Sequence, residues 1–215
     1  MRHRGILAAL GGLFGLGACL DAGGDAATGV SPPWFQASAP RSATLDAGNF
    51  RVMGPRGYCV DPASVVQDDS ASAVLASCMA LANSVYAGPS VAPAVIVVSV
   101  SDTAPSLASL DEEARQILVQ SLAPVGATIV GANTADGVLS AQVNDPGLPA
   151  RKGLAANHAT ALFSQSGRVV SVTAYGIAGN RWSAGQSQKL AAQTVQVLQA
   201  ANGGAAPVSE LSPNG

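Results

Sequence analysis

The segment from residue 158 to residue 202 limits the fold most strongly, because it specifies a β-hairpin followed by a helix. Residues 158–165 alternate in character, Ser166-Gly167 suits a turn, and residues 168–175 return with Val169, Val170, Val172 and Thr173. Ser183 then caps a helix with Gln186 at the third position. The apolar positions of that helix recur at helical spacing: Leu190, Ala191, Thr194, Val197, Leu198 and Ala201. The sequence therefore predicts two paired antiparallel strands and a long C-terminal helix.

Several shorter segments upstream predict further strands. Residues 50–53 form a short strand pattern, and Pro55-Arg56-Gly57 turns the chain into Tyr58-Cys59-Val60. Residues 91–101 contain a run of β-branched residues that is apolar on both faces, which is typical of a central buried strand. Periodicity does not decide between strand and helix for residues 73–81.

The middle of the chain predicts one helix and a second hairpin. Ser109 and Glu112 form a capping box, so a helix of about 12 residues should follow. Residues 127–133 and 138–143 flank Asp136-Gly137, a dipeptide that suits a tight hairpin turn. Residues 145–149 look like an irregular loop. Together these patterns predict an α+β domain, with a mainly antiparallel sheet and packed helices.

Two resemblances extend this prediction. The final hairpin and the long helix after it resemble the ending of the PsbP and Mog1 type of α/β/α domain, and this implies a binding or assembly role. The segment from Phe50 to Asp61, with Cys78 downstream, resembles an uncharacterised family of small exported proteobacterial proteins. That family implies no particular activity.

The N-terminus has the layout of an export signal. Arg2 and Arg4 precede a stretch from Gly5 to Ala18 that contains no charged residue. This stretch is shorter than the roughly 20 apolar residues that a membrane-spanning helix needs. Its end, Leu16-Gly17-Ala18-Cys19, resembles the bacterial lipobox, in which the cysteine becomes the lipidated first residue of the mature protein. The alternative is ordinary cleavage near Ala18, which would release a soluble periplasmic protein.

The lipobox resemblance implies an address and divides the chain. In bacteria that sort lipoproteins by the residue after the lipidated cysteine, an aspartate at that position is an inner-membrane signal. Leu20 occupies the position here, so the resemblance implies the periplasmic face of the outer membrane. The expected divisions are a signal peptide at 1–18, a lipidated flexible tether at 19–48, a single α+β domain at 49–202 and a disordered tail at 203–215. The tether contains one anomaly, the adjacent aromatics Trp34 and Phe35, which could dock on the domain, touch the membrane or engage a partner.

The cysteine count supports the lipid anchor. An exported protein with three cysteines has one thiol left unexplained, and lipidation of Cys19 removes it. Cys59 and Cys78 are then free to pair in an oxidising compartment. Redox-active pairs usually have the Cys-x-x-Cys spacing, so the separation of these two cysteines favours a structural disulfide over a redox role.

Charge argues against nucleic acid as a partner. Without residues 1–18, the chain has nine Lys and Arg against thirteen Asp and Glu, a net charge near −4. Phosphate neutralisation needs clustered cations, and only Arg151 and Lys152 are adjacent in the mature sequence. We expect that pair to lie in a solvated loop.

Motifs for catalysis and metal binding are missing. The mature sequence has no phosphate-binding Gly-rich loop with a lysine, no Cys-x-x-Cys zinc pair and no Gly-x-Ser-x-Gly nucleophile elbow. His158 is the only histidine after residue 18, and its place at the start of a strand predicts an exposed residue near a loop. Asp61, Asp68 and Asp69 match no known calcium loop, so we interpret them as a solvated acidic loop.

The functional hypothesis is therefore a non-catalytic envelope lipoprotein that serves as a binding or assembly module. Its expected partners are membrane lipid, through the N-terminal acyl anchor, and an envelope protein. No cofactor, metal or catalytic residue is assigned. The candidate binding residues are Arg56, Tyr58, Trp34 and Phe35. The alternative is an exported serine/histidine-type hydrolase that uses His158 as its general base.

Overall fold

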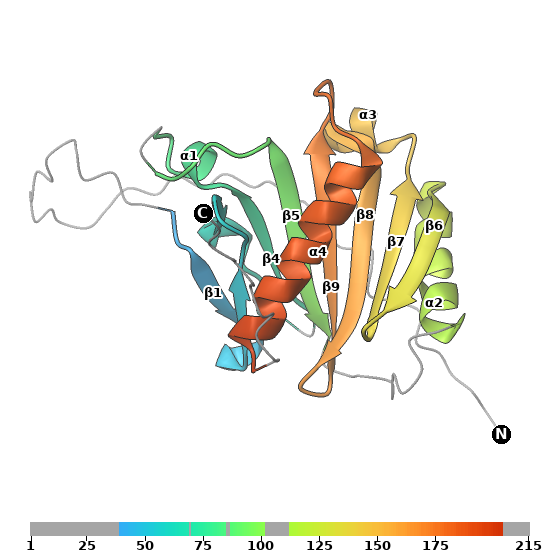
Figure 1. Cartoon of the computed structure of the whole chain (residues 1–215), viewed down its shortest axis with the longest axis horizontal. Helices are drawn as coiled ribbons and strands as arrows, with labels where there is room; N and C mark the ends of the chain where they lie inside the picture. Colours follow the sequence, from blue (N-terminus) through green and yellow to red (C-terminus); the bar gives the residue numbers. More distant parts are fainter. Residues whose placement is uncertain (1–38, 69, 85–86, 102–111, 204–215) are drawn as a thin grey trace, which may run out of the picture. The chain divides into compact units, whose positions relative to one another are not determined.

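The computed structural model describes residues 39–68, 70–84, 87–101 and 112–203 (Figure 1). The strands are β1 (Ser42–Leu45), β2 (Phe50–Met53), β3 (Tyr58–Val60), β4 (Ser70–Ser77), β5 (Ala94–Ser101), β6 (Thr128–Ala135), β7 (Val138–Asn144), β8 (Leu154–Gln165) and β9 (Arg168–Ile177). The α-helices are α1 (Cys78–Leu81), α2 (Glu112–Leu122), α3 (Leu148–Lys152) and α4 (Ala184–Ala201), and the 3-10 helices are η1 (Asp46–Gly48), η2 (Pro62–Ser64) and η3 (Ala123–Val125).

The main sheet has seven strands in the order β3-β4-β5-β9-β8-β7-β6, and every neighbouring pair is antiparallel. Strands β1 and β2 form a separate antiparallel pair. Helix α4 runs diagonally over β8 and β9 and also contacts β2 (Figure 1). The predicted α+β class, with a mainly antiparallel sheet and a long C-terminal helix, is confirmed. The resemblance to the PsbP and Mog1 type stays a prediction.

Both predicted hairpin turns are confirmed. Asp136 and Gly137 join β6 to β7 with φ values of 52° and 72°, and Ser166 and Gly167 join β8 to β9 with φ values of 52° and 75°. Two successive residues with positive φ define the turn whose twist matches that of the flanking strands. These turns set the register, which pairs Ala135 with Val138 in the first hairpin.

The core lies between α4 and one face of the sheet. Strand β5 shows the alternation that produces it, because Ile96 and Val98 are fully buried whereas Val95 and Val97 on the other face are only half-buried. The strand is interior, between β4 and β9, as the sequence predicts. Its apolar character on both faces does not make both faces equally buried, because only the face with Ile96 and Val98 belongs to the core cluster that includes Leu198 of α4.

Helix α4 is fixed at both ends. The predicted capping box is confirmed at its start, where the Ser183 hydroxyl accepts from the Gln186 amide at 3.2 Å and the Gln186 side chain accepts from the Ser183 amide at 2.7 Å. At its end, the Asn202 side chain accepts from the backbone N–H of Arg51 at 2.8 Å and donates to the Arg51 carbonyl at 2.9 Å. The last residue of the predicted domain therefore ties the helix to β2.

The folded part starts earlier than the expected boundary at residue 49. Strand β1 lies inside the range 19–48, for which the sequence predicts a tether, and its Leu45 is fully buried and pairs with Phe50. The carbonyl of Pro40 also accepts from the Val60 N–H at 2.8 Å. A four-residue strand with one large apolar side chain has too weak a pattern to be recognised from sequence.

The structure changes two further expectations about local structure, and two others lie mostly outside the described residues. Residues 73–81 contain both alternatives, since β4 ends at Ser77 and α1 begins at Cys78. Residues 145–149, expected as a loop, lead into the helix α3, so Arg151 and Lys152 are helical and not in a loop.

Of the capping box at residues 109–112, the first three residues lie outside the described ranges, and α2 is described from Glu112. Of the tail, only Gly203 is described.

One close contact between α4's N-terminal segment and the sheet gives a testable result. Gly176 in β9 lies under the indole of Trp182, and a methyl group on Gly176 would be 2.1 Å from the Trp182 Cγ. The indole also donates to the buried Ser187 hydroxyl at 2.6 Å. We expect Gly176→Ala to lower the free energy of unfolding by about 1–3 kcal/mol, because the added methyl group must displace the indole. Urea denaturation measures this change.

The control for this prediction is a double-mutant cycle. In a Trp182→Gly background the Trp182 atoms nearest to the added methyl group, Cβ included, are absent, so Gly176→Ala should change the free energy of unfolding by less than about 0.5 kcal/mol. Equal destabilisation in both backgrounds would contradict the contact.

Candidate functional site

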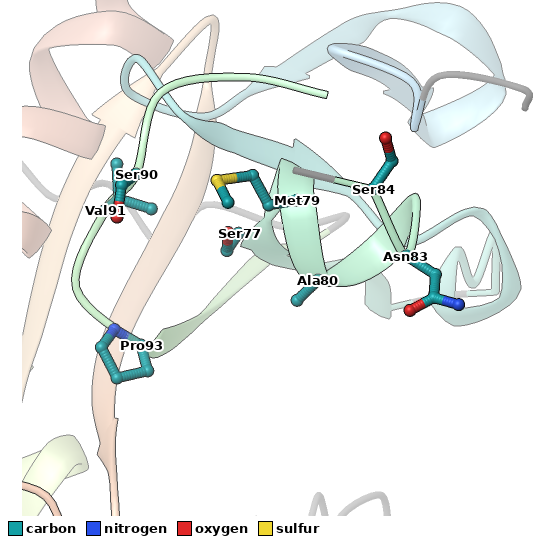
Figure 2. Close-up of a pocket in the computed structure, with 8 residues that line it drawn as sticks. All are labelled: Ser77, Met79, Ala80, Asn83, Ser84, Ser90, Val91 and Pro93. Carbon is teal, nitrogen blue, oxygen red and sulfur yellow. The ribbon is translucent and has the colours of Figure 1, made fainter. Parts of the chain in front are cut away.

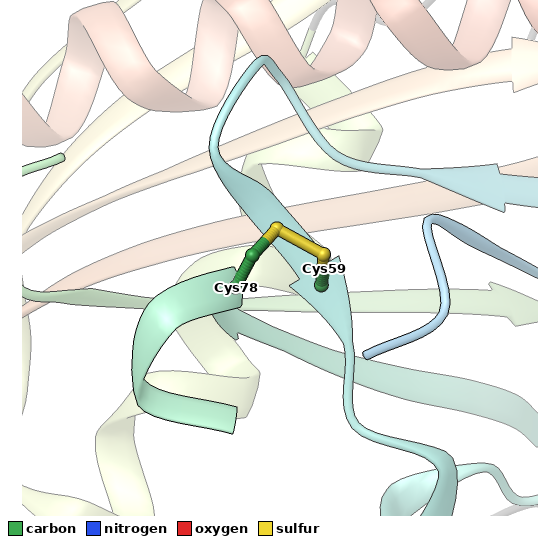
Figure 3. Close-up of a disulfide and its surroundings, with 2 residues drawn as sticks. All are labelled: Cys59 and Cys78. Atoms are coloured by element: carbon green, nitrogen blue, oxygen red, sulfur yellow. A yellow bond between two sulfur atoms is a disulfide. The ribbon is translucent and has the colours of Figure 1, made fainter. Parts of the chain in front are cut away.

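The predicted disulfide is confirmed between Cys59 in β3 and Cys78 at the start of α1 (Figure 3). Both cysteines are buried, and their Cα atoms are 4.8 Å apart. The bond joins the edge strand of the sheet to α1, and the Cys78 amide also donates to the Gly57 carbonyl at 2.9 Å. Cys19, Trp34 and Phe35 lie outside the described residues.

The two candidate binding residues beside the disulfide differ in accessibility. Tyr58 is buried, and its hydroxyl donates to the Ala92 carbonyl at 2.8 Å, so this side chain connects β3 to the segment before β5. Burial raises the pKa of Tyr58. Arg56 is exposed on the turn between β2 and β3. Of the pair, only Arg56 presents its side chain to solvent.

A pocket lies next to α1 (Figure 2), the helix that begins at Cys78 of the disulfide. Its volume is about 390 Å³. Its lining comes from the end of β4, from α1 and the residues after it, and from the segment before β5: Ser77, Met79, Ala80, Asn83, Ser84, Ser90, Val91 and Pro93. None of these lining residues is charged or titratable near neutral pH. The pocket therefore offers a small, mixed apolar and polar surface but no group for acid–base catalysis.

His158 is buried in β8, which corrects the expectation of an exposed residue near a loop. The strand begins four residues earlier, at Leu154, and His158 has Val143 and Tyr175 as its neighbours on the two flanking strands. Its ring centroid is 4.7 Å from that of Tyr175, and Nδ1 is 3.4 Å from the Ala156 carbonyl oxygen. Only 4% of the residue is exposed.

The surroundings of His158 do not resemble a hydrolytic triad. The nearby carboxylate, Asp145, accepts from Arg151 at 2.5 Å and from the Gly147 amide at 3.1 Å. Within the described residues, the hydrogen-bond partner of His158 is a backbone carbonyl, and neither a serine hydroxyl nor a carboxylate bonds to its ring. A general base needs both a proton donor to activate and an orienting group. The geometry around His158 therefore gives the hydrolase alternative no support.

Burial of His158 makes stability depend on pH. Burial lowers the pKa of His158 below the ordinary value of 6.5, an effect that the Ala156 carbonyl and Asp145 partly oppose. The unfolded chain then binds a proton at about pH 6.5 that the folded chain does not bind, so stability falls as pH decreases below about 6.5. We expect wild type to lose thermal stability between pH 7.5 and 5.5 and His158→Gln to lose clearly less. Thermal unfolding at several pH values measures both curves, and parallel curves would contradict the assignment.

The most accessible feature of the sheet is its β6 edge. In the described part of the chain, β6 is the outermost strand on its side, and every one of its residues except the half-buried Ile129 is exposed. The strand contains no charged residue and no proline over residues 128–135. Natural proteins usually protect such edges with charges, prolines, very short strands or a covering segment. Among the residues that the structure describes, the device of this kind at the β6 edge is a bulge at Val130.

The opposite edge of the same sheet is protected. Strand β3 has three residues, all buried, and the disulfide links it to α1. On its outer side, the Val60 N–H donates to the Pro40 carbonyl. The contrast between the two edges indicates that β6 is left accessible while β3 is closed.

Three exposed valines accompany the β6 edge, and we call them the valine cluster: Val119, Val125 and Val130. They are 49%, 48% and 61% exposed and lie on α2, η3 and β6. Helix α2 contacts both η3 and β6, so the three belong to neighbouring elements (Figure 1). Among the described residues, the other large hydrophobic side chain with comparable exposure is Val66. Exposed apolar side chains beside an open strand edge are typical of an interaction surface.

Sequence reasoning missed this surface. The signal available was the uncharged run between Gly126 and Asp136, but nothing in the sequence shows that this strand lies at an edge. The structure therefore adds a candidate functional site, the β6 edge with the valine cluster, while Arg56 and Tyr58 stay predicted binding residues.

No protein-family model matches this chain, and no curated protein matches it significantly. In the described ranges, no helix has the length and apolar character needed to cross a bilayer. The same ranges hold no group of three or more His, Cys, Asp or Glu side chains positioned for a metal ion.

Proposed function

We propose that this protein is an exported envelope lipoprotein whose domain acts as a non-catalytic binding or assembly module. The observation that carries the proposal is the asymmetry of the sheet, in which β3 is closed by a disulfide and Pro40 whereas β6 is long, uncharged and exposed. Backbone N–H and C=O groups at such an edge add a strand from another chain readily. The valine cluster adds exposed apolar side chains on β6, on α2, which contacts β6, and on η3, which contacts α2.

The anchor is the second part of this proposal. The segment Leu16-Gly17-Ala18-Cys19 fits the lipobox, and acylation of Cys19 would hold the domain at the membrane, since each buried methylene contributes about 0.8 kcal/mol. Several acyl chains make such binding stable without a basic patch, which agrees with the net negative charge of the mature sequence. The address is the cell envelope, at the periplasmic face of the outer membrane.

The anchor is tested by mass spectrometry of the protein extracted from envelopes. We expect wild type to carry acyl mass on Cys19 and to sediment with membranes, and Cys19→Ser to be released into the periplasm. An unmodified N-terminus beginning elsewhere would refute the anchor.

The binding surface is tested by cross-linking in intact envelopes. The full-length protein is compared with the double variant Val119→Ser/Val130→Ser, which removes apolar side chains at the candidate site. The matched control is Val66→Ser, because Val66 is 41% exposed on another part of the domain. We expect cross-linked species that the double variant loses and the control keeps. The same cross-linked species in all three proteins would refute the role of this surface.

A further inference from the structure

We infer that the β6 edge pairs with the β6 edge of a second copy of this chain, antiparallel about a twofold axis, so that two seven-stranded sheets become continuous. This inference rests on the proposed function and names the partner of the same surface. It follows from three properties of β6: the direction of its peptide groups, its lack of charge and the position of its bulge.

The peptide groups at the edge are set by the β6–β7 hairpin. In a two-residue hairpin the residues that flank the turn exchange hydrogen bonds, and the next pair does not. The register pairs Ala135 with Val138, Thr134 with Leu139 and Ala132 with Ala141. By this alternation the N–H and C=O groups of Thr134 and Ala132 point away from β7. They are therefore the groups available to an added strand.

These groups are complementary to themselves. An antiparallel pair centred on Asn133 places Ala132 opposite Thr134 of the other copy, so the outward groups of both strands meet. Gly131 then lies opposite Ala135, and Asn133 lies opposite its own copy. A twofold interface requires such a self-complementary patch. Small side chains throughout residues 131–135 leave room for the close approach.

Charge favours a second copy over a charged partner strand. Because residues 128–135 carry no charge, pairing two copies brings no like charges together along the strand. Asp136 lies next to one end of each strand, so in an antiparallel pair the two Asp136 residues are at opposite ends of the interface. A partner selected by charge would need a charged side chain on β6, and β6 has none.

The bulge at Val130 sets the limit of the pairing. The β6–β7 register is interrupted between Ile129 and Gly131 and is regular from Gly131 to Ala135. We therefore expect pairing to cover residues 131–135. Five residue pairs form a small interface, so the valine cluster should contribute to it, and confinement of both copies to one membrane would raise their effective concentration.

The experiment uses Asn133→Cys in the full-length protein, expressed in bacteria and left in the oxidising envelope. Asn133 would lie opposite its own copy in a non-hydrogen-bonded pair, where Cα atoms are about 4.5 Å apart, within the range that a disulfide spans. We expect most of the Asn133→Cys protein to migrate as a reducible dimer of identical chains. The wild-type protein is run beside it, because any reducible dimer formed through Cys19 would also be seen there. Ser164→Cys is the matched control, because Ser164 is exposed on β8 and pairs with Val169 of β9 in the same chain.

A blocking variant tests the backbone pairing itself. Ala132→Pro removes an N–H that points away from β7, so the β6–β7 ladder keeps its bonds while the added strand loses one. Combined with Asn133→Cys, it should reduce the dimer fraction at least tenfold. Thermal unfolding of the combined variant confirms that the domain is folded.

Each outcome separates this inference from the proposed function. The pairing of two copies is overturned if Asn133→Cys stays monomeric and Ala132→Cys and Thr134→Cys, which test neighbouring registers, stay monomeric as well. A disulfide to a different protein would overturn it too, while supporting the binding module. Adding Cys19→Ser tests the anchor separately, since a concentrated, released Asn133→Cys protein should still form the dimer.

Discussion

Replacing both Cys59 and Cys78 with alanine is expected to lower the free energy of unfolding by about 3 kcal/mol. The disulfide closes a loop across a sequence separation of 19, and a loop of about this length contributes about 3 kcal/mol by restricting the unfolded chain. Both sulfur atoms are in the domain interior, so no exposed interaction compensates for the loss. For a domain of this size the change corresponds to a fall of about 6–12 °C in Tm.

The effect should be concentrated at the β3 corner. Strand β3 pairs with β4 over Tyr58, Cys59 and Val60 alone, and its outer side meets the chain at Pro40. Without the disulfide, this three-residue strand depends on those hydrogen bonds and on the burial of its side chains. Local opening there should precede global unfolding, because short edge elements have the lowest local stability.

The measurement compares oxidised wild type, reduced wild type and the double alanine variant. Reduced wild type should match the variant, and a reductant should leave the variant unchanged. Hydrogen exchange of residues 58–60 should increase in the variant more than that of β8 or β9. A variant as stable as oxidised wild type would show that the unfolded chain gains little freedom when the bond is removed.

Local patterns were predictable where a few adjacent residues determine the structure. Asp136-Gly137 and Ser166-Gly167 specify two-residue turns through backbone conformations that glycine adopts readily and that aspartate and serine tolerate here. Ser183 and Gln186 specify the start of α4 through reciprocal hydrogen bonds. These interactions lie within four residues, so the sequence carries them directly.

Burial was less predictable, because it depends on distant parts of the chain. The pattern placed His158 at an exposed strand end, whereas Tyr175 and Val143 on neighbouring strands enclose it. The composition of the segment before residue 49 predicts a tether, yet Leu45 is buried and its strand pairs it with Phe50. In both cases the deciding contact comes from a separate element and leaves no periodic pattern of its own.

The candidate site could not be predicted because it depends on strand order. The β6 and β7 segments look alike in sequence, since both are short, uncharged and joined by a turn. Only the topology shows that β7 is enclosed by β6 and β8 while β6 has a free edge in the described part of the chain. The exposure of Val130 follows from that position.

The second large effect is expected from Phe163→Ala, which should lower the free energy of unfolding by about 3–5 kcal/mol. Phe163 is fully buried in β8, between Val138 on β7 and Val170 on β9. It belongs to the core cluster under α4 that also contains Leu198. Removing the ring leaves a cavity between the sheet and the helix, because backbone hydrogen bonds on both sides hold β8 in place and prevent collapse.

Leu162→Ala is the matched control, because Leu162 is the adjacent residue and points to the opposite face of the sheet. It is half-buried, so its replacement should lower the free energy of unfolding by about 1–2 kcal/mol, clearly less than that of Phe163. Urea denaturation of both variants measures the difference. A one-residue slip in the β8 register would exchange the two faces, and Leu162→Ala would then be the more destabilising change. The order of the two effects therefore tests the register of β8, and the positions of β7 and of the β6 edge depend on that register.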